Sequence, residues 1–273
     1  MKKIYFGING QFGDMIIQEP TLRKIINDNP NTKIVMGGHK KYFEILELYK
    51  DYHKNIIDFK CWDEYTPKTG WPSENDKKYI EENNFDMMYE VAPTHKEVDW
   101  VKHRHITEEM GNMFGVSNDT CDIQLPMLEG VKKEKGSVAL APISSDFYRT
   151  LGKENLSSIV SNLSDRGYTI YHLAGPNEND IKNTIKIQTS YVECVRKMLS
   201  TDFLITVDTG MNWVASAYNH PTIGLYSIMF NPHGGTTKNW QPVNKNAIYL
   251  EARWVNEINI NDILKAIKKM EEI

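Results

Sequence analysis

The sequence predicts an α/β protein of two domains, each with a parallel β-sheet flanked by helices. Segments typical of buried strands alternate with segments that have helical periodicity, and this alternation is typical of parallel sheets. A polar stretch at residues 127–136 interrupts it and then the alternation restarts. The length of 273 residues also exceeds a typical single domain. We therefore expect one domain over residues 1–130 and a second over residues 131–273.

The first half opens with a βαβ unit. Residues 2–8 form the first strand, a glycine turn follows, and residues 15–30 have helical periodicity before a second strand at 32–38. Pro20 marks either the first turn of a helix or a kink, and Asn29-Pro30 ends the pattern. The remaining expected segments are a helix at 40–50, strands at 55–59 and 85–91, a long loop or lid at 61–79, and a helix at 103–116.

The second half repeats the alternation from residue 137 onward. Its strands and helices are consistent with another parallel sheet. The final helix is compatible with packing on either domain. The expected strands are residues 137–143, 168–175, 203–207 and 222–226, and the expected helices are residues 154–167, 187–202, 211–218 and 260–273.

Composition and charge disfavour several classes of protein. A formal net charge of −4 gives no basic surface for non-specific nucleic-acid binding. No apolar run approaches the roughly 18 residues that a membrane span requires, and the N-terminus reaches a strand and glycines too early for a signal peptide. We expect a cytoplasmic protein without a transmembrane segment. Its three cysteines, Cys61, Cys121 and Cys194, form no CxxC pair and are expected to be reduced thiols.

Motifs of the common hydrolases, phosphate-binding loops and metal sites are missing from the sequence. There is no GxSxG, HExxH or GxxxxGK[ST] motif, and no Asp-x-Asp pair that would hold a nucleotide-bound divalent ion. His95, His103 and His105 lack further ligands at a recognisable spacing. The sequence thus predicts no metal site.

The glycine turn after the first strand is a candidate binding segment. Its spacing is GxxGxxG rather than the dinucleotide motif GxGxxG, so a Rossmann NAD site is disfavoured. Gly10 and Gly13 would let the backbone approach a ligand closely. Asp14 then opens a helix, where a plain alternative is that its charge only complements the helix dipole.

A second candidate follows the strand at 203–207. Asp208, Thr209 and Gly210 lead into a helix whose first N–H groups lack helical partners, so the turn suits a phosphate. The alternative is that Asp208 or Thr209 merely caps the helix. In the loop after residue 143, Arg149 or Lys153 would reach a diphosphate, although a single charged loop residue is usually only solvated.

These segments resemble, in order, those of the ADP-heptose:lipopolysaccharide heptosyltransferases. Residues 12–38 are similar to the start of that family, with a Gly-Asp pair that opens a helix and a proline six residues after the Asp. Residues 203–227 resemble its second signature, an Asp-Thr-Gly turn, an alanine-rich helix, Pro-Thr and a strand. Residues 105–116 and 231–242 are similar to its domain-ending helix and proline-bracketed loop. The likeness spans nearly the whole chain, but only Gly-Asp and Asp-Thr-Gly are specific.

The resemblance implies a GT-B fold, in which two Rossmann-like domains face each other across a cleft. It implies an inverting, metal-independent glycosyltransferase that needs a nucleotide-diphosphate sugar as co-substrate and no cofactor. Asp14 matches the catalytic base that would deprotonate the acceptor hydroxyl. The implied donor-phosphate residues are Arg149, Asp208, Thr209, Gly210, Met211 and Asn212.

The remaining implied contacts concern the sugar, the base and the acceptor. Trp213 and Gly175 would contact the donor sugar or base, although the family commonly has histidine where this chain has Trp213. The segment around Arg149 also departs from the usual Lys-x-Trp-Pro. The acceptor side would be lined by Gly10, Gly13, Trp62 and Trp71, or these tryptophans would serve in lid packing.

The sequence leaves alternatives open for both the acceptor and the function. The acceptor is a glycan or lipid-linked glycan, or, less favoured by the acidic charge, a modified base in DNA that would stack on the aromatic loop. A non-catalytic nucleotide-sugar binder and a GT-B epimerase or hydrolase are the alternative functions. The sequence does not predict the oligomeric state.

Overall fold

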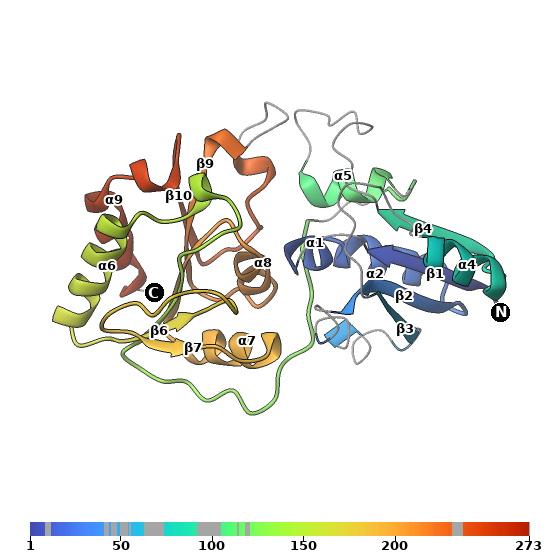
Figure 1. Ribbon diagram of the computed structural model, residues 1–273, viewed down its shortest axis with the longest axis horizontal. Coiled ribbons are helices and arrows are strands. Elements are labelled where there is room, and N and C mark those ends of the chain that lie inside the picture. Colours follow the sequence, from blue (N-terminus) through green and yellow to red (C-terminus); the bar gives the residue numbers. More distant parts are fainter. Residues whose placement is uncertain are drawn as a thin grey trace. The chain divides into compact units, whose positions relative to one another are not determined.

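The computed structural model divides into two compact units, Met1–Pro126 and Met127–Ile273 (Figure 1). Both contain parallel sheets and helices, which confirms the predicted α/β class with two Rossmann-like domains. The residues that the structure describes are 1–8, 12–40, 44, 48–49, 54, 56–62, 74–91, 105–113, 115–117, 121–230 and 237–272.

The first unit is built on a four-stranded parallel sheet with the order β3-β2-β1-β4. Tyr5 of the central strand aligns with Val35 on one side and Met88 on the other. Tyr5 and Val35 also form a buried cluster with Ile80. The strands are β1 (Lys3–Ile8), β2 (Lys33–His39), β3 (Ile56–Trp62) and β4 (Met87–Val91). The helices are α1 (Phe12–Ile17), α2 (Glu19–Asp28), α4 (Glu74–Asn83) and α5 (Ile106–Met113).

The helix expected at residues 15–30 is divided into α1 and α2. Gln18 stands between them as the N-cap of α2, and Pro20 lies in the first turn of α2, where its missing N–H removes no helical hydrogen bond. Asn29 ends α2 and donates its N–H to the carbonyl of Ile26. The first-turn alternative for Pro20 is thus confirmed, and Gln18 alone separates α1 from α2.

The helix α4 replaces the C-terminal part of the loop expected at residues 61–79. Its charged sequence has only a weak apolar face, and among the α4 side chains that the structure describes, Ile80 is the buried one, packed in a cluster with Tyr5. Lys78 and Glu82 pair one turn apart at 3.8 Å, which adds modest helical stability. Strand β3 takes up the first two residues of that loop, Cys61 and Trp62. Residues 63–73 and most of the helix expected at residues 40–50 lie outside the described residues.

The second unit contains a six-stranded parallel sheet with the order β10-β9-β8-β5-β6-β7. Counted from β5, this is the doubly wound order of a Rossmann fold, and its topological switch point lies between β5 and β8. The strands are β5 (Ser137–Ala141), β6 (Thr169–Leu173), β7 (Ile185–Ile187), β8 (Phe203–Val207), β9 (Thr222–Ser227) and β10 (Ala247–Ala252).

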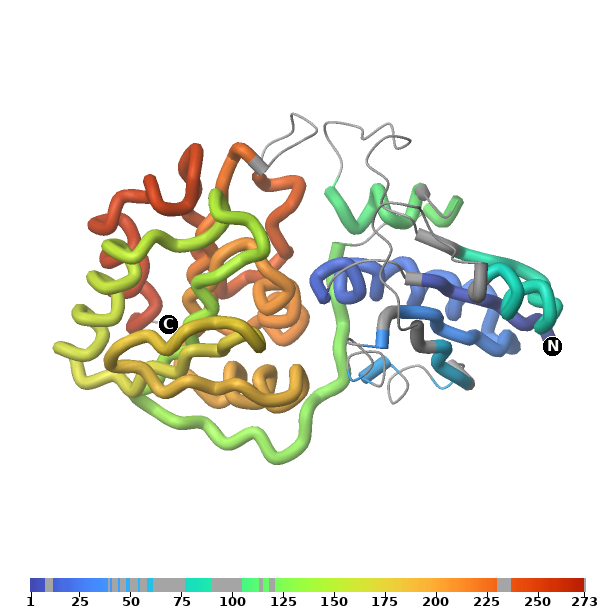
Figure 2. Tube along the Cα trace, viewed as in Figure 1, coloured from blue at the N-terminus to red at the C-terminus, as the bar shows by residue number. Residues whose placement is uncertain are grey.

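Helices cover both faces of the second sheet (Figure 1). Helices α6 and α9 contact each other on one face, and α7 and α8 contact each other on the other. Ile263 and Ile267 of α9 are completely buried in the same core as Val138 of β5, so the last helix packs within the second unit, beside α6 in Figure 2. The helices are α6 (Lys153–Asp165), α7 (Tyr191–Ser200), α8 (Gly210–Ala217) and α9 (Ile260–Met270).

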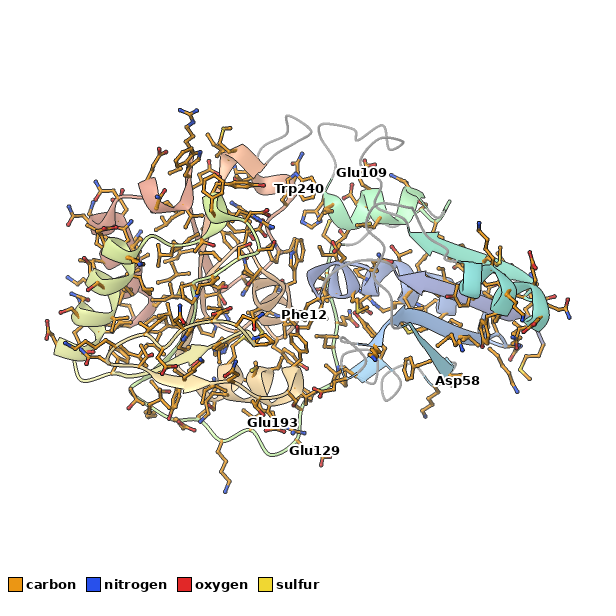
Figure 3. The ribbon with its side chains drawn as sticks, viewed as in Figure 1. Phe12, Asp58, Glu109, Glu129, Glu193 and Trp240 are labelled. Carbon is orange, nitrogen blue, oxygen red and sulfur yellow. The ribbon has the colours of Figure 1, made fainter. Side chains whose placement is uncertain are left out.

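The edge strands β7 and β10 are additions to the predicted pattern. Strand β7 has only three residues, with Lys186 at its centre, and was expected to belong partly to a helix. That helix, α7, begins later, because the Ser190 hydroxyl caps it by accepting from the N–H of Glu193 at 3.3 Å. Glu193 lies on the outer side of α7 (Figure 3). Neither edge strand has a fully buried apolar run, so the sequence signal is weak.

Among the described residues, no helix combines the length and the apolar character needed to cross a membrane. Cys121 and Cys194 are free thiols, and Cys194 is buried. Burial raises the pKa of the Cys121 thiol, which keeps it protonated at neutral pH.

Candidate functional site

The candidate site lies at the carboxyl ends of β5 and β8. These strands are neighbours, with Leu140 aligned to Ile205, although the loops that follow them are far apart in the sequence. The loop after β5 carries Arg149 in a 3₁₀ turn, η2 (Phe147–Arg149), and the loop after β8 begins with Asp208. The topological switch point of a doubly wound sheet therefore brings Arg149 and Asp208 together.

Arg149 uses every nitrogen of its guanidinium. Nη1 donates to Oδ2 of Asp208 at 3.2 Å and to the Asp208 carbonyl at 3.4 Å. Nε donates to Oδ2 of Asp146 at 3.1 Å, and Nη2 contacts the same oxygen and the Ser145 hydroxyl at 3.2 Å. The guanidinium is thus fixed between a buried carboxylate on one side and a more exposed carboxylate on the other.

Asp208 carries its carboxylate in a buried position. Its side chain is 12% exposed, against 36% for Asp146. Burial raises the pKa of Asp208, while the positive charge of Arg149 and its hydrogen bond oppose that rise. The negative charge of Asp146 adds to the increase. Arg149 is therefore the group that favours the ionised form of the Asp208 carboxylate.

The turn after Asp208 leaves the start of α8 without a side-chain cap. Thr209 occupies the N-cap position, but its hydroxyl lies 3.2 Å from that of Thr206 and makes no capping bond. The N–H groups of Gly210 and Met211 belong to the first helical turn and have no intrahelical acceptor, whereas Asn212 donates to the Thr209 carbonyl at 3.1 Å. The start of α8 is therefore better explained as an anion-binding turn than as a helix end capped by a side chain.

The side chains of α8 point into the core rather than toward a ligand. Met211, Asn212 and Trp213 are 9%, 0% and 4% exposed, respectively. The amide of Asn212 donates to the hydroxyl of Tyr226 at 2.6 Å. Met211 can therefore offer a phosphate only its backbone N–H, and the N–H of Asn212 is already donated to the Thr209 carbonyl. The burial of Trp213 favours packing as the role of its indole.

Gly175 follows β6, which pairs with β5 on the side away from β8. The side chain of an acid, Glu178, lies close to its backbone. A Cβ atom at this position would come within 2.9 Å of Oε1 of Glu178. The other carboxylate oxygen of Glu178 is 2.9 Å from Nε2 of His172, which is fully buried. Glu178 was absent from the predicted site, because no motif marks an acid that a buried histidine orients from the preceding strand.

The first unit places Asp14 after its own central strand. Asp14 is in the first turn of α1 and is partly buried, as is Gly13. Strand β1 lies between β2 and β4, so α1 follows the strand at the switch point of this sheet. Gly10 and Trp71 lie outside the described residues, and Trp62 ends β3 with a side chain that is also outside them. Lys153 is exposed at the first position of α6.

Three solved glycosyltransferases share this architecture over the whole chain. A glycosyl transferase family 9 protein from Veillonella parvula aligns with a TM-score of 0.75 at 15% identity, covering 98% of this chain and 97% of that chain. The E. coli ADP-heptose lps heptosyltransferase II aligns at 0.72 and 13% identity, with full coverage of both chains. TibC from enterotoxigenic E. coli, an iron-containing dodecameric glycosyltransferase, aligns at 0.68 and 12% identity, covering 100% of this chain and 79% of that chain.

The chain has the GT-B fold. No protein-family model matches its sequence, and no curated protein sequence matches it significantly. The GT-B likeness is therefore carried by the two parallel sheets and their connections, not by overall sequence identity.

In this fold, functional residues are expected at the carboxyl ends of strands in two places. One is the end of β1 in the first unit, and the other is the shared end of β5 and β8 in the second unit. In the second, the N–H groups of Gly210 and Met211 are oriented donors for an anion, and a guanidinium that Asp208, Asp146 and Ser145 hold lies in the same cluster. In the described part of the chain, no cluster of three or more His, Cys, Asp or Glu side chains has the arrangement of a metal site. The described donors thus suit a phosphorylated ligand.

Proposed function

We propose that the protein is an inverting glycosyltransferase of the heptosyltransferase type. It transfers a sugar from a nucleotide-diphosphate donor to an acceptor hydroxyl. The observation that carries the proposal is the position of Asp208, Thr209 and Gly210, with Arg149, at the switch point of a GT-B second domain. The Gly13-Asp14 pair, which follows the central strand of the other sheet, gives independent support.

The donor diphosphate is held by the start of α8 and by Arg149. The N–H groups of Gly210 and Met211 stabilise the charge that grows on the departing diphosphate, and the guanidinium adds charge-assisted hydrogen bonds. These groups supply the neutralisation that a divalent ion provides in other transferases, which supports a metal-independent reaction without a cofactor. TibC, which has been solved with ADP-D-beta-D-heptose, makes ADP-sugars the first donors to test.

Asp14 is the general base in this proposal. Its carboxylate takes the proton of the acceptor hydroxyl as that oxygen attacks the anomeric carbon. The bond from the anomeric carbon to the diphosphate oxygen breaks on the opposite side, so the configuration inverts. The nucleoside diphosphate leaves with the electron pair of that bond.

The acceptor in this proposal is a glycan or a lipid-linked glycan. The heptosyltransferase II to which the chain is similar acts on lipopolysaccharide by its name, which supports a sugar acceptor. The net charge of −4 disfavours a DNA acceptor, because no excess of positive charge is available for the phosphate backbone. We place the reaction in the cytoplasm, where nucleotide sugars are available as donors.

The proposal is tested by measuring nucleotide release from a panel of nucleotide sugars with and without glycan and oligonucleotide acceptors. The native protein, Asp14→Asn and a control, Asp28→Asn, are compared; Asp28 is an exposed acid on α2 that pairs with Lys24. Acceptor-dependent release should persist in the control and fall by at least about a hundredfold in Asp14→Asn. Equal release by both variants would overturn the role of Asp14.

A non-catalytic nucleotide-sugar binder is the second candidate. It is favoured by Trp213, since an indole carries no positive charge and has one hydrogen-bond donor and no acceptor, unlike the histidine that the resemblance leads one to expect there. Nucleotide binding without acceptor-dependent release from any donor would support this candidate over the transferase. Acceptor-independent release of free sugar, or conversion of the donor sugar, would point to the hydrolase or epimerase alternative.

A further inference from the structure

The contacts of Arg149 show two different edges of its guanidinium. Nη1 faces Asp208, whose carboxylate is buried, while Nε and Nη2 face Asp146, whose side chain is 36% exposed. The edge formed by Nε and Nη2 has two parallel N–H donors and is one of the two guanidinium edges that bind carboxylates and phosphates in a bidentate way. In this structure that edge of Arg149 is occupied by an acid of its own loop, the more exposed of its two carboxylate partners.

The charges of this cluster are unbalanced. One guanidinium lies between two carboxylates, so the cluster has an excess of negative charge when Asp146 and Asp208 are both ionised. A diphosphate brought to the same guanidinium would be repelled by Asp146 and would compete with it for Nε and Nη2. Asp208 does not compete in this way, because it contacts Nη1 from the buried side.

We propose that Asp146 is a built-in competitor of the donor diphosphate, and that Asp208 is the residue that positions Arg149. Asp146 neutralises the phosphate-binding edge of Arg149 in the unliganded protein and yields that edge to the incoming phosphate oxygens. Asp208 holds the opposite edge in both states. This inference rests on the proposed function, since it assigns the phosphate-binding partner within the same site.

The location of Asp146 supports an exchange of partners. It precedes the 3₁₀ turn η2, makes no side-chain capping bond there, and lies three residues from Arg149, so its carboxylate can leave without breaking the helix start. The Asp146 side chain is 36% exposed, so its carboxylate regains hydrogen bonds to water when it leaves Arg149, which offsets part of the cost of exchanging it for a phosphate. A doubly charged diphosphate gains more from the same edge than a single carboxylate does.

The test compares the binding of ADP, inorganic pyrophosphate and adenosine to the native protein, Asp146→Asn and Asp262→Asn by isothermal titration. Asp262 is a matched control, because it also pairs with a cation three residues away, Lys265, but on α9. Both variants remove one negative charge. Asp146→Asn should bind ADP and pyrophosphate roughly fivefold or more tightly than the native protein, while Asp262→Asn should not.

A second readout separates competition from a structural role. Adenosine has no phosphate, so its affinity should be the same in the native protein and in Asp146→Asn, and the gain for ADP should shrink as salt is raised. Unchanged or weaker ADP and pyrophosphate binding by Asp146→Asn, with native binding intact, would overturn the inference alone. If neither the native protein nor any variant binds any nucleoside diphosphate or pyrophosphate, the proposed function falls, and the inference falls with it.

Discussion

The guanidinium of Arg149 donates from Nη1 to Oδ2 of Asp208 at 3.2 Å, joining two loops whose residues are 59 positions apart. The contact fixes the turn that precedes α8 relative to the loop after β5. It also holds a cation at Asp208, two residues before α8 begins at Gly210. The donor site that we propose depends on this pair.

Replacement of Arg149 by alanine should weaken nucleoside diphosphate binding by at least about tenfold, because charge-assisted hydrogen bonds to the phosphate are lost. Stability should also fall, by roughly 1–3 kcal/mol, since Asp208 would be left buried and unpaired. Isothermal titration and urea denaturation measure the two effects. Arg166→Ala is the control, because Arg166 pairs with Glu271 at 2.8 Å on the surface of the same unit. Similar losses in both variants would contradict a specific role for Arg149.

The order of the strands explains why this pair was not predicted from the sequence. The residue pattern indicated Arg149 and Asp208 separately, each from a loop after a strand, and the resemblance assigned both to the donor phosphate without a contact between them. Their contact requires β5 and β8 to be neighbours, with β6 and β7 on the far side of β5. The alternation of strands and helices does not specify that order, because several parallel arrangements share it.

Buried strands and helices were predicted correctly from the sequence, whereas the exposed ones were missed. Strands β5 and β8 are buried at every residue, and both were predicted within two residues of their bounds. Strand β10 has no fully buried residue, and α4 has a weak apolar face, so neither gives a clear periodic pattern. Glu178 was missed for a related reason, since only the fold brings His172 to it.

Stability should decrease as the pH falls below neutrality because of His220. Burial, followed by the positive charge of Lys133, lowers the pKa of His220 to about 3. The unfolded chain takes up a proton near pH 6.5 and the folded chain does not, so the stabilisation is present above pH 6.5 and is lost toward pH 3. From pH 7 to pH 5 this amounts to about 2 kcal/mol.

Urea denaturation at both pH values tests this, with His220→Gln as the comparison. The variant should lose less stability than the native protein between pH 7 and pH 5, because its side chain does not titrate. Equal losses in the two proteins would show that His220 is not the group responsible.

Trp213 should matter for stability rather than for nucleotide affinity. Since its side chain is 4% exposed, Trp213→Ala should cost about 3–5 kcal/mol in urea denaturation. Trp213→Phe, which keeps an aromatic ring, should cost less and should leave ADP affinity within about twofold of the native value. A large loss of affinity in Trp213→Phe at unchanged stability would instead make the indole a donor contact.

Two glycines of the second unit should respond differently to alanine. At Gly224 of β9, a Cβ atom would come within 2.5 Å of the Tyr249 ring, which is held because its hydroxyl donates to the Pro242 carbonyl at 2.8 Å. At Gly175 the approach is longer, 2.9 Å, and the nearest atom is Oε1 at the far end of the flexible Glu178 side chain, which needs only a small shift that keeps Oε2 on His172. Gly224→Ala should therefore cost roughly 1–3 kcal/mol and Gly175→Ala less than about 1 kcal/mol. Equal costs in thermal or urea unfolding would contradict this difference.

The most direct test of the donor site is amide hydrogen exchange with and without a saturating nucleoside diphosphate. If the start of α8 binds the diphosphate, peptides that cover residues 208–213 should exchange more slowly in the complex, because the N–H groups of Gly210 and Met211 become hydrogen-bonded. Peptides of α6, on the opposite face of the sheet, should not change. Protection that spares residues 208–213 while the nucleotide is bound would contradict the account.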